Sequence, residues 1–154
     1  VYKKLANKHF DKLVRDIRSK FGTSLISTKE TINVINDNEN NNIKSITGFL
    51  SDQSPRLTKD VYWSHFMGIN VPCYTGAERL AKKLDLTTAY LKVTKVKRGF
   101  YEAEIMTLAE NPKEYSDYQL TDMFLREVEK QIYETPEYYF WTHKRWKHRG
   151  KDAK

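Results

Sequence analysis

Segments with the periodicity of amphipathic helices alternate along this chain with short segments typical of β-strands, and this alternation restricts the fold more than any other feature. Apolar residues recur at three- and four-residue spacing over 5–21, and a second helix is expected after Thr28. Further helices are predicted over 75–84 and 117–134, and Pro136 ends the last one. Strands that alternate with helices indicate an α/β layered structure.

Four segments are predicted to be strands on their β-branched and apolar content: 24–27, 43–50, 88–96 and 100–108. The tight connection Lys97-Arg98-Gly99 between the last two predicts a hairpin. A hairpin among alternating strands and helices favours a mixed sheet over an all-parallel one. Residues 62–73 are expected to form an irregular, aromatic-rich connection. We therefore predict a mixed central sheet flanked by helices.

Composition excludes a disordered chain and favours anionic partners. Hydrophobic residues make up 39% of the 154 positions and aromatic residues 13%, which is enough to form a core. The net charge of +7 suits nucleic acid, phosphate-bearing lipids or an acidic membrane surface, and does not choose among them. Cys73 is the single cysteine, so no disulfide forms within the chain, and we expect it to be buried or incidental.

Several kinds of site have no sequence support. The four histidines lack the spacing of zinc ligands, and no phosphate-binding glycine loop, dinucleotide-binding fingerprint or serine nucleophile elbow is present. No apolar run approaches the roughly 18 residues that a membrane-spanning helix needs. We expect no metal and no cofactor.

Asp52 and Gln53 follow the predicted strand over 43–50 directly. Open α/β sheets place their sites at the carboxyl ends of strands, where a carboxylate can orient an imidazole or hold a loop. The alternative is an ordinary turn aspartate before Ser54-Pro55.

Arg18 lies on a basic flank of the first predicted helix, together with Arg15 and Lys12. A guanidinium can hold a phosphate through two parallel hydrogen bonds, which a lysine cannot reproduce. The alternative is a solvated helix face without a ligand.

The densest signal is the segment 141–149, in which two tryptophans are interleaved with basic and imidazole groups. Its candidate residues are His143, Arg145 and Trp146. Such a segment suits a membrane interface, with indoles at headgroup depth and cations on phosphates. It also suits stacking on nucleobases, and a packed tail whose tryptophans belong to the core is a third possibility.

Taken together and in chain order, these motifs resemble the bacterial lipid A biosynthesis (late) acyltransferases of the lysophospholipid acyltransferase superfamily. The resemblance is carried by Asn7, Asp11 and Arg18, then Asp52-Gln53, Phe66-Met67-Gly68, Pro72, Thr75-Gly76 and Leu80-Ala81, and finally Pro136-Glu137 with Trp141-Thr142-His143-Lys144-Arg145-Trp146-Lys147. The closing W-x-H-x-R-W-K pattern is the specific part. The particular residues of these motifs are similar to those of Bacteroidetes-type members.

The resemblance implies a transfer of a fatty acyl chain from a thioester on acyl carrier protein or coenzyme A to a hydroxyl of a lipid A precursor. It places the reaction at the cytoplasmic face of the bacterial inner membrane, with its anionic surface as a partner and without nucleic acid. The family's general base is the histidine of a His-x4-Asp/Glu motif, which the acid orients. No histidine of this sequence has an acidic residue at that spacing.

The resemblance therefore implies that the chain is the C-terminal portion of a single acyltransferase domain, with the motif before Val1. It would have a partial glycerolipid acyltransferase-like fold that is inactive alone and open to self-association. Arg18 would neutralise a substrate phosphate or charge near the reacting centre. Asp52 would order the pocket beside Gln53.

The tail residues His143, Arg145 and Trp146 would frame the mouth of the site or hold the headgroup, according to the same resemblance. We expect them to converge with Arg18 and Asp52 around one pocket. Two alternatives remain open, which are a basic nucleic-acid-binding module and a membrane-docking domain without catalysis.

Overall fold

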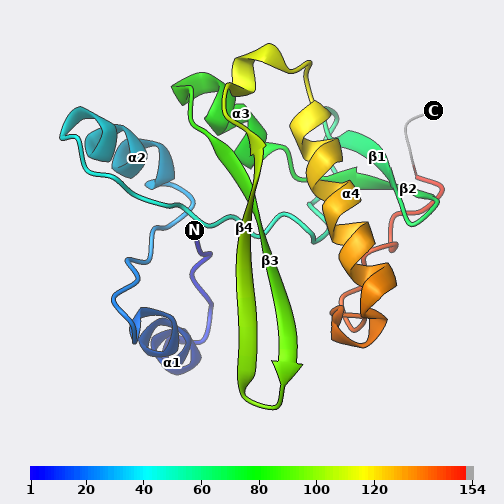
Figure 1. Ribbon diagram of the computed structural model, residues 1–154, viewed down its shortest axis with the longest axis horizontal. Helices are drawn as coiled ribbons and strands as arrows, with labels where there is room; N and C mark the ends of the chain where they lie inside the picture. The colour runs from blue at the N-terminus through cyan, green and yellow to red at the C-terminus, as the bar shows by residue number, and fades with distance from the viewer. Residues whose placement is uncertain (152–154) are drawn as a thin grey trace. The chain divides into compact units, whose positions relative to one another are not determined.

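The computed structural model describes residues 1–151 and divides the chain into two compact units, Val1–Leu50 and Ser51–Lys154. Figure 1 labels the helices and strands of each. The two units are described separately below.

The first unit contains two helices, α1 (Lys8–Ser19) and α2 (Thr31–Asn40). The side chain of Asn7 caps α1 by accepting hydrogen bonds from the first free backbone N–H groups of the helix. Asp11 is buried, with 5% of its surface exposed, and accepts a 2.8 Å hydrogen bond from the backbone N–H of Leu5. That bond fixes the segment before the helix against the first helical turn. Both predicted helices are confirmed.

The strand predicted over 43–50 is wrong. Among the described residues of this unit, the only β-pairing is an isolated parallel bridge between Tyr2 and Ser27, so the strand predicted over 24–27 is wrong as well. Ile46 is 89% exposed. β-branched residues favour a strand only where a neighbouring strand supplies hydrogen bonds and packing, and 43–50 has no such neighbour.

The second unit contains two β-hairpins and two helices. Strands β1 (Tyr62–Phe66) and β2 (Ile69–Cys73) pair antiparallel, as do β3 (Thr88–Lys97) and β4 (Phe100–Ala109). The helices are α3 (Gly76–Leu84) and α4 (Gln119–Glu134), and the short 3₁₀ turns η1 (Pro112–Glu114) and η2 (Pro136–Tyr138) precede and follow α4. The core joins both hairpins to α4 through Phe66, Val71, Cys73, Tyr90, Leu125, Val128 and Ile132.

The predicted mixed central sheet is wrong, because the strands described between residues 1 and 151 form two separate two-stranded antiparallel sheets. The β3–β4 hairpin and the helices over 75–84 and 117–134 are confirmed within a few residues.

The first hairpin corrects the irregular connection expected over 62–73. Its turn residues Met67 and Gly68 have φ of 52° and 75°, the left-handed pair that a two-residue hairpin turn requires. The buried carboxylate of Glu129 on α4 accepts a hydrogen bond from the Met67 N–H and thereby holds the turn. Methionine rarely adopts this conformation, so the sequence carried no turn signal here.

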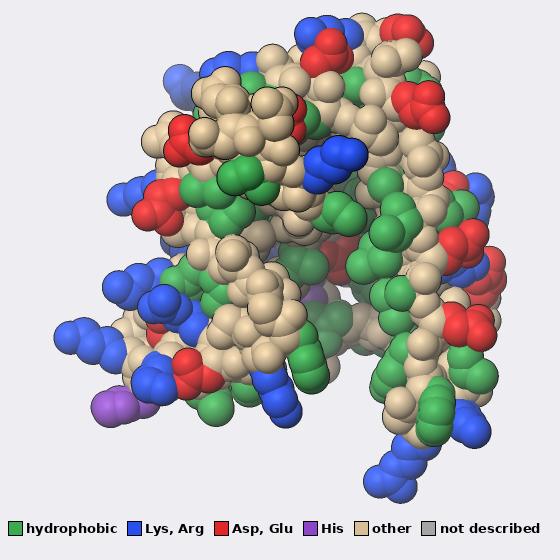
Figure 2. Space-filling model, turned by 60° about the vertical axis from the view of Figure 1, so that its left-hand side comes forward, with side chains coloured by type: hydrophobic (Ala, Val, Ile, Leu, Met, Phe, Trp, Pro, Cys, Tyr) green, Lys and Arg blue, Asp and Glu red, His purple; other side chains and the backbone are tan. Residues whose placement is uncertain are grey.

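The β3–β4 hairpin exposes apolar side chains on one face. Leu91, Ile105 and Tyr101 are 58%, 63% and 64% exposed, and Leu91 and Ile105 are paired across the two strands. Figure 2 shows hydrophobic side chains running down this hairpin toward its basic tip. The opposite face packs on α4 through Tyr90, which contacts the Phe124 ring edge-on.

Candidate functional site

Arg145 is the largest fully buried side chain of the described residues, with 0% of its surface exposed. Its Nη1 donates hydrogen bonds to the Pro72 carbonyl oxygen at 2.9 Å and to Ser54 Oγ at 3.4 Å. Its Nη2 lies 3.6 Å from Cys73 Sγ, and the guanidinium lies 5.3 Å from the centre of the Phe66 ring. The guanidinium therefore joins the end of β2, the β1 core residue and the segment around Ser54.

No ion pair joins Arg145 to an acidic residue anywhere in the described residues 1–151, and its Nε has no hydrogen-bond acceptor there. The charge is held by neutral oxygens, a sulfur and an aromatic face instead. An unneutralised cation in the interior raises the affinity of its surroundings for negative charge.

Ser54 fastens the tail to the segment that carries Asp52 and Gln53. Its Oγ donates a 2.7 Å hydrogen bond to the Arg145 carbonyl oxygen, 91 residues away in sequence. Its backbone N–H donates a 3.0 Å hydrogen bond to His143 Nε2, 89 residues away. Asp52 and Gln53 directly precede this doubly held serine, so the tail limits where both can lie.

The negative charge of Asp52 influences the pKa values of Tyr139 and Tyr90. Burial raises the pKa of Tyr139, and the negative charge of Asp52 adds to the rise while Arg145 opposes it. Burial also raises the pKa of Tyr90 to about 12, and Glu127 and then Asp52 add to that rise. Asp52 is half-buried and Gln53 is exposed. The charge of Asp52 thus acts on Tyr139 and on the tail, while the predicted roles of Asp52 and the tail in one pocket stay a prediction.

The surroundings of His143 favour its neutral form. Burial lowers its pKa from the ordinary 6.5, the nearby cations Lys147 and Arg145 lower it further, and Asp52 opposes them. Because Nε2 accepts the Ser54 N–H, the ring proton of the neutral imidazole belongs on Nδ1. His143 therefore serves as a hydrogen-bond acceptor that positions the Ser54 segment.

Trp146 is packed rather than free. Its Nε1–H donates a 3.3 Å hydrogen bond to the Phe66 carbonyl oxygen, and its ring stacks on Phe66 and on Trp141 at centroid distances of 5.8 and 6.0 Å. Trp141, by contrast, is 50% exposed. The possibility of a packed tail is confirmed for Trp146, while Trp141 is half-exposed and its Nε1–H donates a 2.7 Å hydrogen bond to the Pro136 carbonyl oxygen.

Arg18 lies in the last turn of α1, in the first unit. It is close enough to the Val1 ammonium that its charge adds to burial in lowering the pKa of that group. Asp52 and the tail belong to the second unit. The expected convergence of Arg18 with them stays a prediction.

A second polar cluster, which the sequence did not indicate, lies between β1 and α4. Asp122 accepts hydrogen bonds from Tyr62 Oη at 2.8 Å and from Ser64 Oγ at 2.6 Å, beside a cleft of about 480 Å³. Burial raises the pKa of Tyr62 to about 12, and the bond to Asp122 adds to the rise. Because Tyr62 and Ser64 both donate directly to Asp122, the cluster anchors β1 to α4.

Across residues 1–151, no three histidine, cysteine, aspartate or glutamate side chains gather closely enough to hold a metal ion. The helices described in that range are also too short or too polar to cross a membrane.

Comparison with known proteins gives one result at the level of the family. A family model described as bacterial lipid A biosynthesis acyltransferase matches residues 1–148. No curated protein matches the chain. The resemblance that the motifs indicated is therefore confirmed for the family over nearly the whole sequence, while the Bacteroidetes-type likeness stays a prediction.

Proposed function

The chain belongs to the bacterial lipid A biosynthesis acyltransferases, and from that membership we propose that it serves the transfer of a fatty acyl chain to a hydroxyl of a lipid A precursor or related lysolipid. The donor is a thioester on acyl carrier protein or coenzyme A. The reaction takes place at the cytoplasmic face of the inner membrane. The observation that carries the proposal is the family match over residues 1–148.

In this proposal Asp52 and Gln53 form the protein side of the acyl-transfer pocket. Support comes from Ser54, which the tail holds by hydrogen bonds to Arg145 and His143. Arg145 then acts as a positioning residue, because its enclosed guanidinium bonds protein atoms. This replaces direct headgroup contact as its expected role.

The proton acceptor is a separate part of the proposal. His9, His65, His143 and His148 are followed at the fifth position by Val14, Asn70, His148 and Ala153, so none forms a His-x4-Asp/Glu pair. We therefore assign the general base to sequence outside these 154 residues, and the chain alone is expected to be inactive. Arg18 would supply a cation for a substrate phosphate or for charge near the reacting centre.

The test is an acyl-transfer assay on protein expressed from the complete gene, with a lipid A precursor as acceptor. Asp52→Asn is expected to lower the rate about a hundred-fold, because a small displacement of the pocket misaligns the reacting groups. Asp60→Asn removes the same charge from an exposed position of the same segment and is expected to leave the rate unchanged.

Two results would reject the enzymatic proposal. One is a complete gene that encodes no His-x4-Asp/Glu motif. The other is an Asp52→Asn protein that transfers acyl chains as fast as the Asp60→Asn control.

A second candidate function, membrane docking, is favoured by the exposed side of the tail. Tyr138, Phe140 and Trp141 are 53%, 61% and 50% exposed, next to the exposed cations Lys144 and Lys147. Aromatic rings and cations in such a mixture suit the headgroup region of an anionic membrane. Docking is compatible with acyl transfer, since the lipid acceptor of the proposed reaction lies in a membrane.

Binding to single-stranded nucleic acid has less support. Trp146 stacks against Phe66 and Trp141, so its ring is engaged within the protein. A nucleobase platform needs ring faces that are open to the ligand. Binding of single strands at low salt that weakens steeply as salt is added would restore this function as a candidate.

A further inference from the structure

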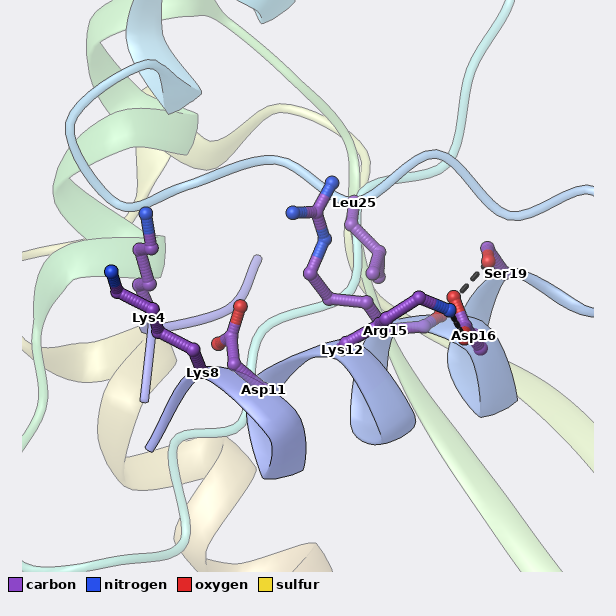
Figure 3. A pocket seen from close by; sticks show the side chains of 8 residues that line it. All are labelled: Lys4, Lys8, Asp11, Lys12, Arg15, Asp16, Ser19 and Leu25. Carbon is purple, nitrogen blue, oxygen red and sulfur yellow. Dashed lines mark hydrogen bonds and ion pairs between the residues drawn. The ribbon is translucent and has the colours of Figure 1, made fainter. Parts of the chain in front are cut away.

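The first unit contains a cleft of about 530 Å³ along α1 that the acyl-transfer proposal does not use. Its wall is mostly charged and is formed by Lys4, Lys8, Asp11, Lys12, Arg15, Asp16, Ser19 and Leu25 (Figure 3). Arg18, the arginine singled out from the sequence, does not line it.

The cations of this cleft outnumber the acids, and both acids are already engaged. Asp16 pairs with Lys12 at 2.6 Å. Asp11 is buried and accepts the backbone N–H of Leu5. Within the described residues, no ion pair joins Lys4, Lys8 or Arg15 to an acid. Lys4, Lys8 and Arg15 therefore face the cleft without an ion pair, and its four cations and two acids leave a net charge of +2.

Sequence spacing and local bonds hold these cations together. Lys8, Lys12 and Arg15 recur at four and three residues, which places them on one face of α1. Lys4 precedes the helix, and the bond from Leu5 to Asp11 holds its segment against the first turn. In Figure 3 the side chains of Lys4, Lys8 and Arg15 project to the same side of the helix.

The opposite face of α1 is apolar, with Leu13 and Ile17 53% and 62% exposed. Figure 2 shows Lys and Arg side chains gathered over this part of the molecule. The cleft cations of α1 are therefore confined to one face and are not spread evenly around the helix.

We propose that this cleft binds a phosphate monoester. Arg15 would bind two phosphate oxygens through its planar fork, and Lys4 and Lys8 would neutralise the remaining charge as point cations. A phosphate monoester carries up to two negative charges and three acceptor oxygens, which matches three unpaired cations better than a singly charged phosphodiester does. The phosphate is borne either by a lipid headgroup or by a soluble metabolite.

The experiment measures binding of the full 154-residue chain to three kinds of phosphatidylcholine vesicle: undoped, doped with phosphatidic acid, or doped with an equal charge of phosphatidylglycerol. Inorganic phosphate is tested by itself and as a competitor. We expect tighter binding to phosphatidic acid, a monoester, than to phosphatidylglycerol, a diester. Arg15→Ala is expected to weaken phosphatidic acid binding about ten-fold and to remove this preference, because charge-assisted bonds are lost.

Arg79→Ala is the matched control, since Arg79 is an exposed helical arginine of the second unit. It is expected to leave the preference unchanged. Lys8→Gln is a second variant of the cleft and is expected to weaken binding in the same direction as Arg15→Ala. Circular dichroism of each variant checks that the helices persist.

The outcomes separate the sources of phosphate. Competition by inorganic phosphate supports a soluble ligand, and preference for phosphatidic acid without such competition supports a lipid headgroup. Equal binding to the two anionic lipids, with no binding of inorganic phosphate, overturns the proposal, as does an Arg15→Ala protein that behaves like the control. None of these results depends on acyl transfer, so the two proposals fail independently.

Discussion

At the residue scale, Arg145 shows how a charge can be used without an acidic partner. Burying a cation costs free energy unless hydrogen bonds and favourable dipoles replace water. Around the Arg145 guanidinium, water is replaced by the Pro72 carbonyl, the Ser54 hydroxyl and the face of the Phe66 ring. The result is a planar connection between β2, β1 and the tail that depends on the shape of the guanidinium.

Arg145→Lys is accordingly expected to destabilise the fold by about 2 kcal/mol, because one ammonium cannot reach the separate acceptors that the guanidinium fork reaches. Urea unfolding followed by tryptophan fluorescence measures the change. Arg149→Lys, an identical substitution at an exposed position, is the control and should leave the midpoint nearly unchanged. Equal midpoints for the two variants would contradict the role given to Arg145.

His143 makes a contribution to stability that depends on pH. Its pKa is lowered in the folded protein, first by burial and then by nearby cations, so the unfolded chain takes up a proton more readily. The stability is therefore fully present above the ordinary value of 6.5 and is lost as the pH falls from there toward the folded pKa. Protonation also removes the acceptor of the Ser54 N–H.

The expected result is a free energy of unfolding that decreases between about pH 7 and pH 5 more steeply for the wild type than for His143→Gln. Glutamine offers a neutral acceptor at a similar reach and does not titrate. The lowered pKa of His148 acts in both proteins, so the difference between the two slopes isolates His143. Parallel pH curves would show that His143 has no such influence.

At the scale of elements, the β1–β2 hairpin shows how a helix can impose a turn that the local sequence does not favour. The left-handed conformation of Met67 is costly for a residue with a side chain. Glu129 accepts the Met67 N–H, and Arg126 pairs with the same carboxylate at 2.9 Å. A buried, hydrogen-bonded carboxylate on α4 thus selects the turn, and the turn directs Phe66 into the core.

Gly68→Ala tests the turn. Gly68 has φ of 75°, and no atom lies within 4 Å of the place where a Cβ would stand, so the cost is conformational. We expect a loss of about 1 kcal/mol of stability by chemical denaturation. Gly76→Ala also meets no neighbouring atom, lies at the start of α3 without a positive φ, and should be neutral or slightly stabilising. A neutral Gly68→Ala variant would count against the left-handed turn.

At the scale of the whole molecule, the net charge of +7 favours binding to any anionic surface. Membrane docking through the tail would instead depend on the cations of that one segment. Lys144→Gln with Lys147→Gln is expected to reduce co-sedimentation with phosphatidylglycerol vesicles at least ten-fold, because each cation near the surface contributes about 1 kcal/mol. The control is Lys97→Gln with Arg98→Gln at the exposed β3–β4 turn, which changes the net charge equally. Equal losses in the two double variants would mean that the attraction is diffuse.

Self-association also belongs to this scale. Apolar residues are exposed on α1 and on the β3–β4 hairpin, and we predict that the chain self-associates. Sedimentation velocity over a range of concentrations measures this association. A single monomeric species at every concentration would contradict it.

The helices, the β3–β4 hairpin and the family could all be predicted from the sequence. Helical periodicity, the Lys97-Arg98-Gly99 turn and the W-x-H-x-R-W-K ending are local patterns, and local patterns are legible one segment at a time.

The pairing of the strands and the role of Arg145 depend on contacts between residues far apart in the sequence. A strand forms when another strand pairs with it, and among the described residues of its unit 43–50 has no such partner. Residues 62–73, by contrast, form a hairpin whose turn is held by a hydrogen bond to Glu129 of α4. The Ser54 side chain meets the Arg145 carbonyl across 91 residues, and no local pattern encodes a contact at that separation. The sequence therefore predicted Asp52 and the tail as candidates, while the hydrogen bonds between Ser54 and the tail follow from packing.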